Sequence, residues 1–313
     1  MLDISIAVIG AGYMAREHLR AFEGLSGVRL AGIVSRTHER AAQLGKEFNI
    51  PAYPSIQTLY EATKADLVVV TVPELSTAAV ASQCFAHPWS VLLEKPAGYN
   101  LADATSIRDA ARGRNVYVAF NRRAYSSTRE ALKALENVDA PRFIKVVDQQ
   151  DQEAAMRNHG QPELVAENYM FANSIHVIDY FRVFGRGKII DVTPVIAWNP
   201  KEPGVVIAKV TFDSGDVGLY EGIWNGPGPW SLTITTPHKR LELRPLEQGS
   251  LQLRETRTQI PLEISQDDTM FKPGLRWQAM QAAAAVRGQM HSLATIDDSW
   301  ESMKLVADIF GMR

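Results

Sequence analysis

The stretch that decides the fold is ISIAVIGAGYMA, residues 4–15. Its apolar run leads directly into Gly10 and Gly12, and Ala15 takes the third glycine position of a G-x-G-x-x-G motif. A strand, such a turn and a helix together bring backbone N–H groups and a helix N-terminus against a pyrophosphate. The motif alone is common, and a plain glycine-rich turn is the alternative, but its place at the start of a strand–helix unit favours dinucleotide binding. The predicted cofactor contacts here are Gly10, Gly12, Tyr13 and Met14.

Apolar, β-branched runs alternate with helical patterns as far as about residue 121. Strands that are buried on both faces of a parallel sheet have this composition. The alternation predicts an α/β fold with a doubly wound parallel sheet, that is, a Rossmann domain over residues 1–121. The expected strands cover 4–10, 28–35, 51–53, 66–73, 90–96 and 116–121.

The end of the second strand bears on the choice of cofactor. NAD-binding folds usually carry an acid there to hold the ribose 2′-hydroxyl, whereas a nearby arginine can accommodate the 2′-phosphate of NADP. This chain has Ser35 and Arg36, and no acid before Glu39. A helix N-cap at Ser35 or Thr37, followed by solvated charges, is the alternative, and the two are compatible. We predict NADP as the cofactor, with NAD possible.

Beyond residue 121 the strands alternate polar and apolar residues. This pattern predicts one largely antiparallel open sheet in an α+β domain over residues 122–313, with Asp213, Ser214 and Gly215 in a tight hairpin. A sheet with an apolar face must bury it against helices or another subunit, so we expect a homodimer or homotetramer. The ligand is expected between the two domains. Helices are expected over 274–288 and 297–310, the second with Asp297 or Asp298 at its N-cap.

Composition narrows the class of protein. A length of 313 residues suggests about two domains. A net charge of −2 provides no basic field to recruit nucleic acid or an anionic membrane. No apolar stretch reaches the roughly 18 residues needed to span a bilayer, the N-terminus lacks the basic region of a signal peptide, and the single Cys84 fits a reducing compartment. We expect a soluble, cytoplasmic protein with no nucleic-acid or membrane partner.

Five short motifs follow one another along the chain. They are GAGYMA after the first strand, TVPE after the fourth, EKP after the fifth, NRR after the sixth and SIHVID on a later helix. In this order they make the chain resemble the glucose–fructose oxidoreductase / inositol dehydrogenase / MocA (Gfo/Idh/MocA) family over essentially its whole length. The resemblance implies NAD(P)-dependent oxidation or reduction of a sugar, cyclitol or nucleotide-sugar.

The resemblance also implies roles for individual residues. Lys95 of the EKP motif is expected beside the nicotinamide and the substrate, and His176 is expected to transfer a proton. Pro96 favours an extended Lys95 at the carboxyl end of a parallel strand, where such sheets bind ligands, although a solvated charge pair with Glu94 is the alternative. Asp179 lies three residues after His176, on the same helix face, and is expected to orient its ring. The remaining candidates are Thr71, Pro73, Glu94 and Asn121 for the cofactor, and Asn121, Tyr169 and Asn173 for the substrate; no metal site is expected.

Two positions depart from the family pattern. Ala172 stands four residues before His176, where the family often has an aspartate, and Tyr169, Asn173 or Asp179 are candidates to compensate. The histidine often found after the fourth strand is also absent. The alternative function is therefore a catalytically weak dinucleotide-binding sensor or partner protein. The segment WNGPGPW, residues 224–230, is either a rigid turn between strands, an aromatic lip over a sugar or part of an oligomer contact.

Overall fold

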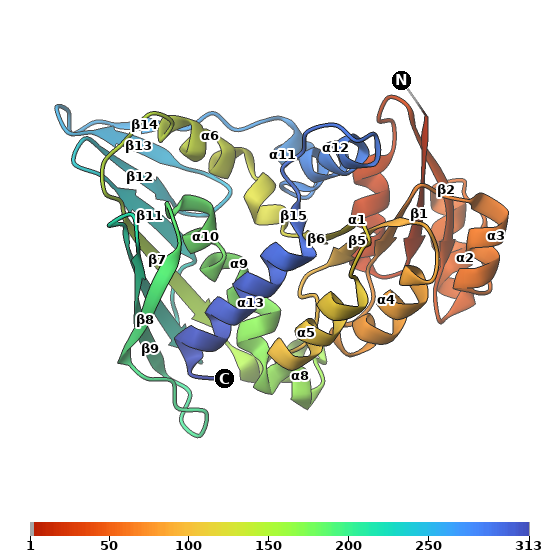
Figure 1. Ribbon diagram of the computed structural model, residues 1–313, viewed down its shortest axis with the longest axis horizontal. Helices are drawn as coiled ribbons and strands as arrows, with labels where there is room; N and C mark the ends of the chain where they lie inside the picture. Colours follow the sequence, from red (N-terminus) through yellow and green to blue (C-terminus); the bar gives the residue numbers. More distant parts are fainter. Residues whose placement is uncertain (1–2, 313) are drawn as a thin grey trace. The chain divides into compact units, whose positions relative to one another are not determined.

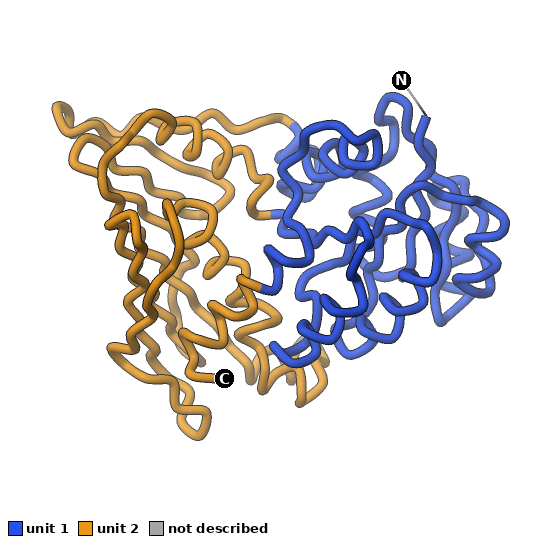
Figure 2. The backbone as a smooth tube through the Cα atoms, viewed as in Figure 1, with its two compact units in different colours: residues 1–121, 267–300 blue, residues 122–266, 301–313 orange. Residues whose placement is uncertain are grey.

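The computed structural model describes residues 3–312, which fall into two compact units (Figure 2). Unit 1 comprises residues 1–121 and 267–300, and unit 2 comprises residues 122–266 and 301–313. The sequence analysis placed residues 267–300 in the second domain, whereas in the structure they pack with the first sheet. The assignment of the cofactor to the first unit and of the substrate to the second stays a prediction.

Unit 1 is built on a seven-stranded sheet with the order β15-β6-β5-β4-β1-β2-β3 (Figure 1). All neighbouring strands run parallel except β15, which is antiparallel to β6. The first strand lies inside the sheet and the chain winds outward from it in both directions, so the predicted doubly wound sheet is confirmed. The strands are β1 (Ile4–Ile9), β2 (Val28–Val34), β3 (Ala52–Tyr53), β4 (Leu67–Val70), β5 (Ser90–Glu94), β6 (Val116–Ala119) and β15 (Ala294–Thr295).

Helices cover both faces of this sheet, as its buried strands require. Ile6 and Val8 of β1 share one apolar core with α1, α2 and α12. Ala7 and Ile9 point to the opposite face, because side chains alternate along a strand, and α3 and α4 pack against the strands there. The helices of unit 1 are α1 (Tyr13–Phe22), α2 (His38–Glu47), α3 (Ile56–Thr63), the 3-10 turn η1 (Glu74–Ser76), α4 (Thr77–Phe85), α5 (Leu101–Ala110), α11 (Asp267–Met270) and α12 (Leu275–Val286).

The late segment of unit 1 is attached to the sheet through α12. Leu275, Ala279 and Ala282 of this helix are buried in the core that α1 also lines. Arg276 adds polar contacts, because its Nη1 donates to the carbonyl oxygens of Ala21 and Glu23, each at 2.7 Å. These carbonyls belong to the C-terminal end of α1, where a cation is favoured. A helix with small buried residues thus finds its partner surface on the first sheet.

The last helix, α13 (Ile296–Phe310), begins in unit 1 and continues into unit 2. The prediction of Asp297 or Asp298 at its N-cap is wrong. The backbone N–H of Asp298 donates to Thr295 Oγ1 at 3.1 Å, and the N–H of Thr295 donates to Asp298 Oδ2 at 3.0 Å. Thr295 is therefore the cap and Asp298 sits at the third helical position, in a reciprocal capping box.

Unit 2 is built on an eight-stranded sheet with the order β14-β13-β12-β11-β7-β10-β9-β8 (Figure 1). Only β7 and β10 pair in parallel, so the predicted largely antiparallel sheet is confirmed. The predicted hairpin joins β9 to β10, with Gly215 at φ +85°. The strands are β7 (Phe143–Gln150), β8 (Ile189–Ile196), β9 (Val205–Phe212), β10 (Val217–Trp224), β11 (Ser231–Thr235), β12 (Lys239–Leu243), β13 (Ser250–Leu253) and β14 (Gln259–Pro261).

The two faces of this second sheet differ. Along β7, β9 and β10 fully buried side chains alternate with partly exposed ones. Helices pack on the buried face, where the ring of Phe310 meets those of Tyr220 and Trp224 at centroid distances of 5.9 and 5.7 Å. On the other face Phe143 and Val205 remain 44% and 46% exposed. The remaining helical segments are η2 (Asn121–Ala124), α6 (Ser126–Ala134), α7 (Gln152–His159), α8 (Glu163–Glu167), the π-helix η3 (Met170–Ser174), α9 (Ile175–Ile178) and α10 (Tyr180–Phe184).

No helix within residues 3–312 is both long and apolar enough to cross a membrane.

Candidate active site

The carboxyl edge of the first sheet gathers most of the residues predicted to bind the cofactor. Parallel strands end at the same edge, which is where open α/β sheets bind ligands. Residues from five strand ends therefore share this edge within unit 1. They are Gly10 after β1, Ser35 after β2, Thr71 after β4, Lys95 after β5 and Asn121 after β6.

Glycine occupies the two positions of the first turn for different structural reasons. Gly10 has φ +114°, and a Cβ there would lie 2.4 Å from Thr71 Oγ1 and 2.5 Å from the Thr71 carbonyl oxygen. Gly12 has an ordinary φ of −94°, and a Cβ there would meet no described atom within 4 Å. Packing within the chain explains Gly10 and leaves Gly12 unexplained. Open space at the N-terminus of the ten-residue α1 is the cradle that a pyrophosphate needs, so the residues fit a dinucleotide.

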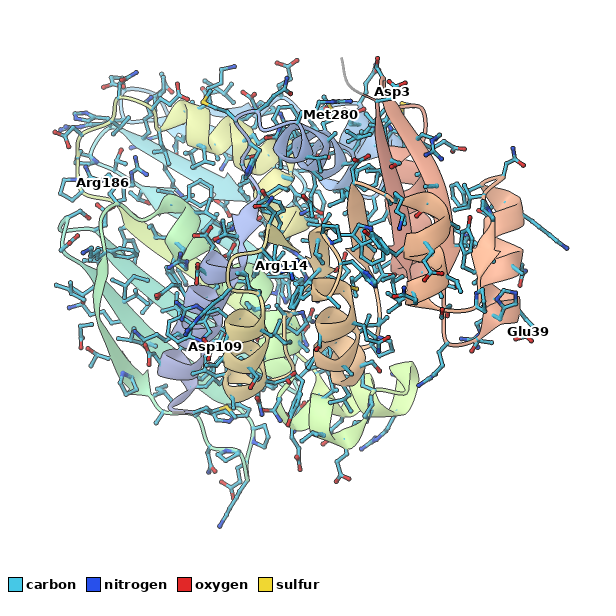
Figure 3. The ribbon with its side chains drawn as sticks, turned by 45° about the vertical axis from the view of Figure 1, so that its right-hand side comes forward. Asp3, Glu39, Asp109, Arg114, Arg186 and Met280 are labelled. Carbon is cyan, nitrogen blue, oxygen red and sulfur yellow. The ribbon has the colours of Figure 1, made fainter. Side chains whose placement is uncertain are left out.

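The end of β2 carries the residues that bear on the 2′-phosphate. Ser35 is half-buried and Arg36 is exposed, and among residues 3–312 no ion pair with Arg36 is present. Thr37 occupies the N-cap position of α2, but its side chain makes no capping hydrogen bond. Glu39 lies in the first turn of α2, at the N-terminal end of that helix, and is exposed (Figure 3). Thr37 thus occupies the cap position without capping the helix through its side chain, and the exposed Arg36 is accessible to a ligand.

Lys95 follows β5 and is joined to Pro96 by a cis peptide bond. Its neighbour Glu94 is held on both carboxylate oxygens. Oε2 accepts the backbone N–H of Lys95 at 3.2 Å, and Oε1 lies 2.6 Å from Nε2 of His18. Glu94 is therefore not a solvated strand-end charge, because its side chain and that of His18 are only 13% and 2% exposed. His18, a residue of α1, was missed by the sequence analysis.

Other predicted residues of unit 1 are placed as follows. Asn121 is 6% exposed, and its Nδ2 donates to the carbonyl oxygen of Pro273 at 3.1 Å. The backbone N–H of Thr71 donates to the Ile9 carbonyl oxygen at 2.7 Å, which ties the ends of β1 and β4 together. Pro73 is exposed two residues further on. Tyr13, at the start of α1, is 64% exposed.

In unit 2 the segment around His176 is a broken helix. The sequence analysis placed His176 and Asp179 on one face of a single helix, whereas the structure has four short pieces, with a π-helical turn at Met170–Ser174. π-helical turns occur frequently at functional sites. His176 is 5% exposed and follows this turn directly, while Ala172 within it is buried. Tyr169 and Asn173 are half-buried beside it.

Asp179 is firmly engaged by two other residues. Its carboxylate takes two hydrogen bonds of 2.6 Å from Nε and Nη2 of Arg123, and a third of 2.6 Å from the Ser302 hydroxyl. The side chain is 2% exposed. These contacts explain Asp179 as the buried partner of an arginine, and its predicted action on the His176 ring stays a prediction.

Trp230 borders the imidazole of His176, with ring centroids 6.3 Å apart. Its Nε1 donates to the Gln149 carbonyl oxygen at 2.8 Å, and the Arg122 guanidinium stacks 4.6 Å from its ring centre. The tryptophan is therefore fixed in place. It also lines a mostly apolar pocket of about 420 Å³ together with Pro229, Arg244, Pro245, Leu246 and Glu247.

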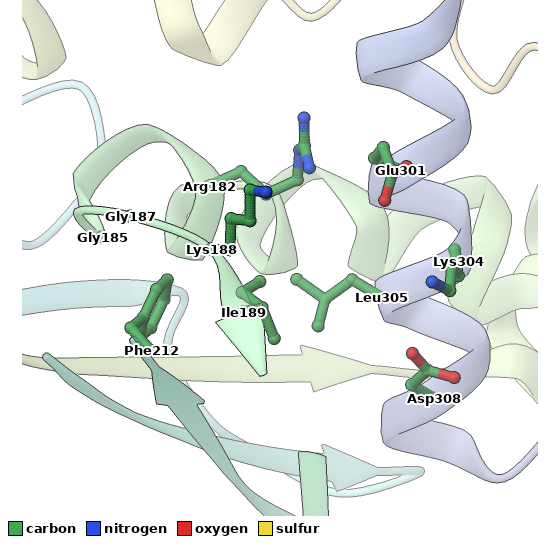
Figure 4. A pocket seen from close by; sticks show the side chains of 10 residues that line it. All are labelled: Arg182, Gly185, Gly187, Lys188, Ile189, Phe212, Glu301, Lys304, Leu305 and Asp308. Atoms are coloured by element: carbon green, nitrogen blue, oxygen red, sulfur yellow. The ribbon is translucent and has the colours of Figure 1, made fainter. Parts of the chain in front are cut away.

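A second pocket of unit 2 has a different character. It measures about 410 Å³ and mixes three cations with two carboxylates around an apolar floor (Figure 4). None of the predicted site residues lines it. Its charged residues are Arg182, Lys188, Glu301, Lys304 and Asp308. The described residues contain no group of three or more histidine, cysteine, aspartate or glutamate side chains that could hold a metal ion.

The chain is similar in sequence to two sugar dehydrogenases. It is 25% identical over 221 residues to a UDP-N-acetylglucosamine 3-dehydrogenase of Acidithiobacillus ferrooxidans, covering 69% of this chain and 66% of that protein, just under two thirds. It is 29% identical over 132 residues to a glucose-6-phosphate 3-dehydrogenase of Bacillus subtilis, covering 42% of this chain and 37% of that protein.

Structural comparison shows the same fold over the full length. A levoglucosan dehydrogenase in complex with NADH and levoglucosan superposes with a TM-score of 0.80 at 18% identity, covering 99% of this chain and 96% of that one. The crystal structure of the A. ferrooxidans enzyme gives a TM-score of 0.80 at 17% identity, covering 100% and 98%. The model of an oxidoreductase family with an NAD-binding Rossmann fold matches residues 4–122. Residues 4–122 thus match the NAD-binding Rossmann domain of this oxidoreductase family, and the chain as a whole shares the fold of the dehydrogenase structures.

Proposed function

We propose that this protein transfers a hydride between NADP(H) and a secondary carbinol or carbonyl carbon of a sugar, cyclitol or nucleotide-sugar. The carrying observation is the carboxyl edge of the first sheet, where open space at Gly12 adjoins the N-terminus of α1 and Lys95 follows a strand two places away. Two of the three sequence relatives are named as 3-dehydrogenases of a sugar, which supports a ring hydroxyl as the reacting group, whereas the third is named as a 4-carboxy-2-hydroxymuconate-6-semialdehyde dehydrogenase.

The cofactor contacts follow from unit 1. The first N–H groups of α1, at Tyr13 and Met14, bind the pyrophosphate over Gly12. Arg36 receives the 2′-phosphate with Ser35 beside it, since an arginine–phosphate contact is charge-assisted. When bound, the nicotinamide supplies the hydride acceptor or donor. Thr71, Pro73, Glu94 and Asn121 complete the cofactor site in this proposal.

The protein's own part in the chemistry is to hold the reacting oxygen and move its proton. In the oxidation direction the substrate hydroxyl loses a proton as hydride leaves the same carbon. His176 serves as the acid/base, since imidazole titrates near neutral pH. Lys95 donates a hydrogen bond to the reacting oxygen and stabilises negative charge there. The pair formed by His18 and Glu94 braces the backbone of Lys95.

The substrate contacts that we propose in unit 2 are of two kinds. Tyr169 and Asn173 offer hydrogen bonds to sugar hydroxyls, as does Asn121 in unit 1. The pocket beside Trp230 offers an apolar wall for the face of a sugar ring, and Arg244 and Glu247 are its charged lining residues. This favours the aromatic lip among the interpretations of the WNGPGPW segment.

The test is turnover of the purified protein with NADP⁺ or NAD⁺ and a panel containing UDP-N-acetylglucosamine, glucose 6-phosphate and levoglucosan. We expect Lys95→Met and His176→Asn each to lower turnover on the order of 10²-fold while the cofactor still binds. The exposed Lys46→Met and His238→Asn are the matched controls and should retain full activity. Normal turnover in both site variants would exclude this site.

A second candidate function is a dinucleotide-binding sensor with weak catalysis. The buried Ala172 favours it, because no carboxylate occupies that position on the π-helical turn. Tight NADP binding without steady turnover on any panel sugar would support the sensor, whereas sustained turnover would exclude it.

We also propose that the protein is a cytoplasmic homodimer or homotetramer that associates through the exposed face of the second sheet. The partly exposed Phe143 and Val205 on that face support this assembly. Sedimentation at micromolar concentration should give an oligomer, and Phe143→Lys should shift it toward the monomer. A monomeric wild-type protein would contradict the proposal.

A further inference from the structure

A carboxylate with no part in the proposed chemistry is buried under the π-helical turn. Asp148 lies on the helix-covered face of β7 and is 0% exposed. Gln150, two residues on, is 1% exposed, and Tyr220 of β10 is 0% exposed. Buried polar groups are costly unless they are fully hydrogen-bonded, so such a cluster needs a reason.

The hydrogen bonds of the cluster have a defined direction. The Tyr220 hydroxyl donates to Asp148 Oδ2 at 2.7 Å, and Nε2 of Gln150 donates to Asp148 Oδ1 at 2.7 Å. An ionised carboxylate only accepts, so Gln150 must present its NH₂ group to it. The amide oxygen of Gln150 then faces away, and it accepts Nδ2 of Asn173 at 2.9 Å. Asn173 is thereby left with its oxygen, Oδ1, as its remaining acceptor.

This direction holds both for ionised Asp148 and for Asp148 protonated on Oδ2. Burial raises the pKa of Asp148, more than the hydrogen bonds from Ser174, Tyr220 and Gln150 and the charge of Arg122 lower it. A proton on Oδ2 would point to Tyr220, whose hydroxyl oxygen is able to accept it. Burial also raises the pKa of Tyr220 well above its ordinary value, so that its hydroxyl stays protonated. In both of these states Oδ1 accepts from Gln150.

The cluster orients a residue next to the proposed proton-transfer group. Asn173 lies on η3, three residues before His176, and is half-buried, whereas Ala172 beside it is buried and apolar. Asn173 is thus a polar side chain of this turn that is held by a hydrogen bond to Gln150 and remains partly exposed. A neutral amide is also compatible with the nearby Asp148, because a second carboxylate would add like-charge repulsion.

We propose that Asn173 Oδ1 accepts a hydrogen bond from a substrate hydroxyl next to the reacting carbon, and that Gln150 and Asp148 are positioning residues that hold the amide in this orientation. The inference rests on the proposed function, since it names a substrate contact of the same reaction. In this proposal the oriented Oδ1 of Asn173 serves as the hydrogen-bond acceptor in place of the carboxylate that position 172 lacks.

The first test measures the orientation without any turnover. In ¹⁵N-labelled protein, the side-chain NH₂ signal of Asn173 is assigned by its loss in Asn173→Ala. We expect Gln150→Met, which keeps the length of the side chain, to shift this signal and to accelerate its exchange with water about tenfold or more. Gln149→Met is the control, because Gln149 bonds Gly226 on the other face of β7 and should leave the signal unchanged. An unchanged signal in Gln150→Met would overturn the positioning role.

The second test uses the panel sugar that gives turnover with NADP⁺. Loss of one neutral hydrogen bond predicts a fall in kcat/KM of about tenfold for Asn173→Ala and several-fold for Gln150→Met. The double variant should equal Asn173→Ala alone, because Gln150 acts only through Asn173. Independent, additive losses would overturn the proposal, as would full activity of Asn173→Ala. If the wild-type protein turns over no panel sugar, the proposed function fails, and the exchange measurement still decides the positioning role.

Discussion

The two glycines of the first turn should respond in opposite ways to the same small substitution. Gly10→Ala adds a methyl group 2.4 Å from Thr71 Oγ1, at a residue with φ +114°. Gly12→Ala adds a methyl group with no described atom within 4 Å, at an ordinary φ of −94°. The first change acts on the fold and the second acts on the space reserved for a ligand.

The magnitudes follow from these contacts. At Gly10, backbone strain costs about 1–3 kcal/mol and overpacking against Thr71 costs about as much again, so the free energy of unfolding should fall by about 2–6 kcal/mol. At Gly12, alanine fits the backbone and should raise the free energy of unfolding by about 0.4–1 kcal/mol, because it restricts the unfolded chain. The loss of one charge-assisted N–H contact to the pyrophosphate would weaken NADPH binding about tenfold or more.

The assay combines urea unfolding with calorimetric titration of NADPH. Gly12→Ala should be at least as stable as the wild type and bind NADPH about tenfold or more weakly, and Gly12→Val should bind more weakly still. Gly10→Ala should unfold at a clearly lower urea concentration. The reasoning is refuted if Gly12→Ala binds NADPH as tightly as the wild type, or if Gly10→Ala is equally stable.

Three further changes give separate predictions. Arg36→Ala should weaken NADP binding about tenfold or more with little effect on NAD, whereas tighter binding of NAD than NADP by the wild type, in calorimetry, would contradict the cofactor preference. Arg123→Met leaves the buried Asp179 carboxylate without its arginine, so the free energy of unfolding, measured in urea, should fall by about 3–5 kcal/mol. Arg112 is the control: its side chain is 82% exposed, and Arg112→Met should have almost no effect. Burial raises the pKa of the Cys84 thiol to about 12, so at about pH 8 it stays protonated and should resist a thiol reagent until the protein unfolds; rapid labelling of the native protein would count against this.

The first domain was predictable because its signals are local. A strand, a G-x-G-x-x-A turn and a helix are contiguous in sequence, and the strand ends that follow must share one edge of a parallel sheet. The position of Lys95 followed from the same rule. The link between His18 and Glu94 did not, because the two residues lie far apart in sequence and nothing in a helical pattern marks which position faces a distant strand end.

The second unit was predictable in class and less so in detail. Alternating residues identified a largely antiparallel sheet, but polar residues in a strand usually mark the solvent face. Asp148 and Gln150 therefore gave no sign that they are buried. Periodicity also cannot distinguish a continuous helix from one interrupted by the π-helical turn at Met170–Ser174. The helical pattern over 274–288 predicted a helix but not the sheet on which it packs, and the structure places its buried residues in the core of the first sheet.

The most direct test of the central claim is to follow the hydride itself. The protein is incubated with NADP⁺ and UDP-N-acetylglucosamine or glucose 6-phosphate deuterated at ring carbon 3, and the reduced cofactor is analysed by mass spectrometry. The account predicts one deuterium in the cofactor for each sugar oxidised, with transfer lost on the order of 10²-fold in Lys95→Met and in His176→Asn. Sugar oxidation that leaves the cofactor unlabelled, or no transfer from either sugar although NADP⁺ binds, would contradict it.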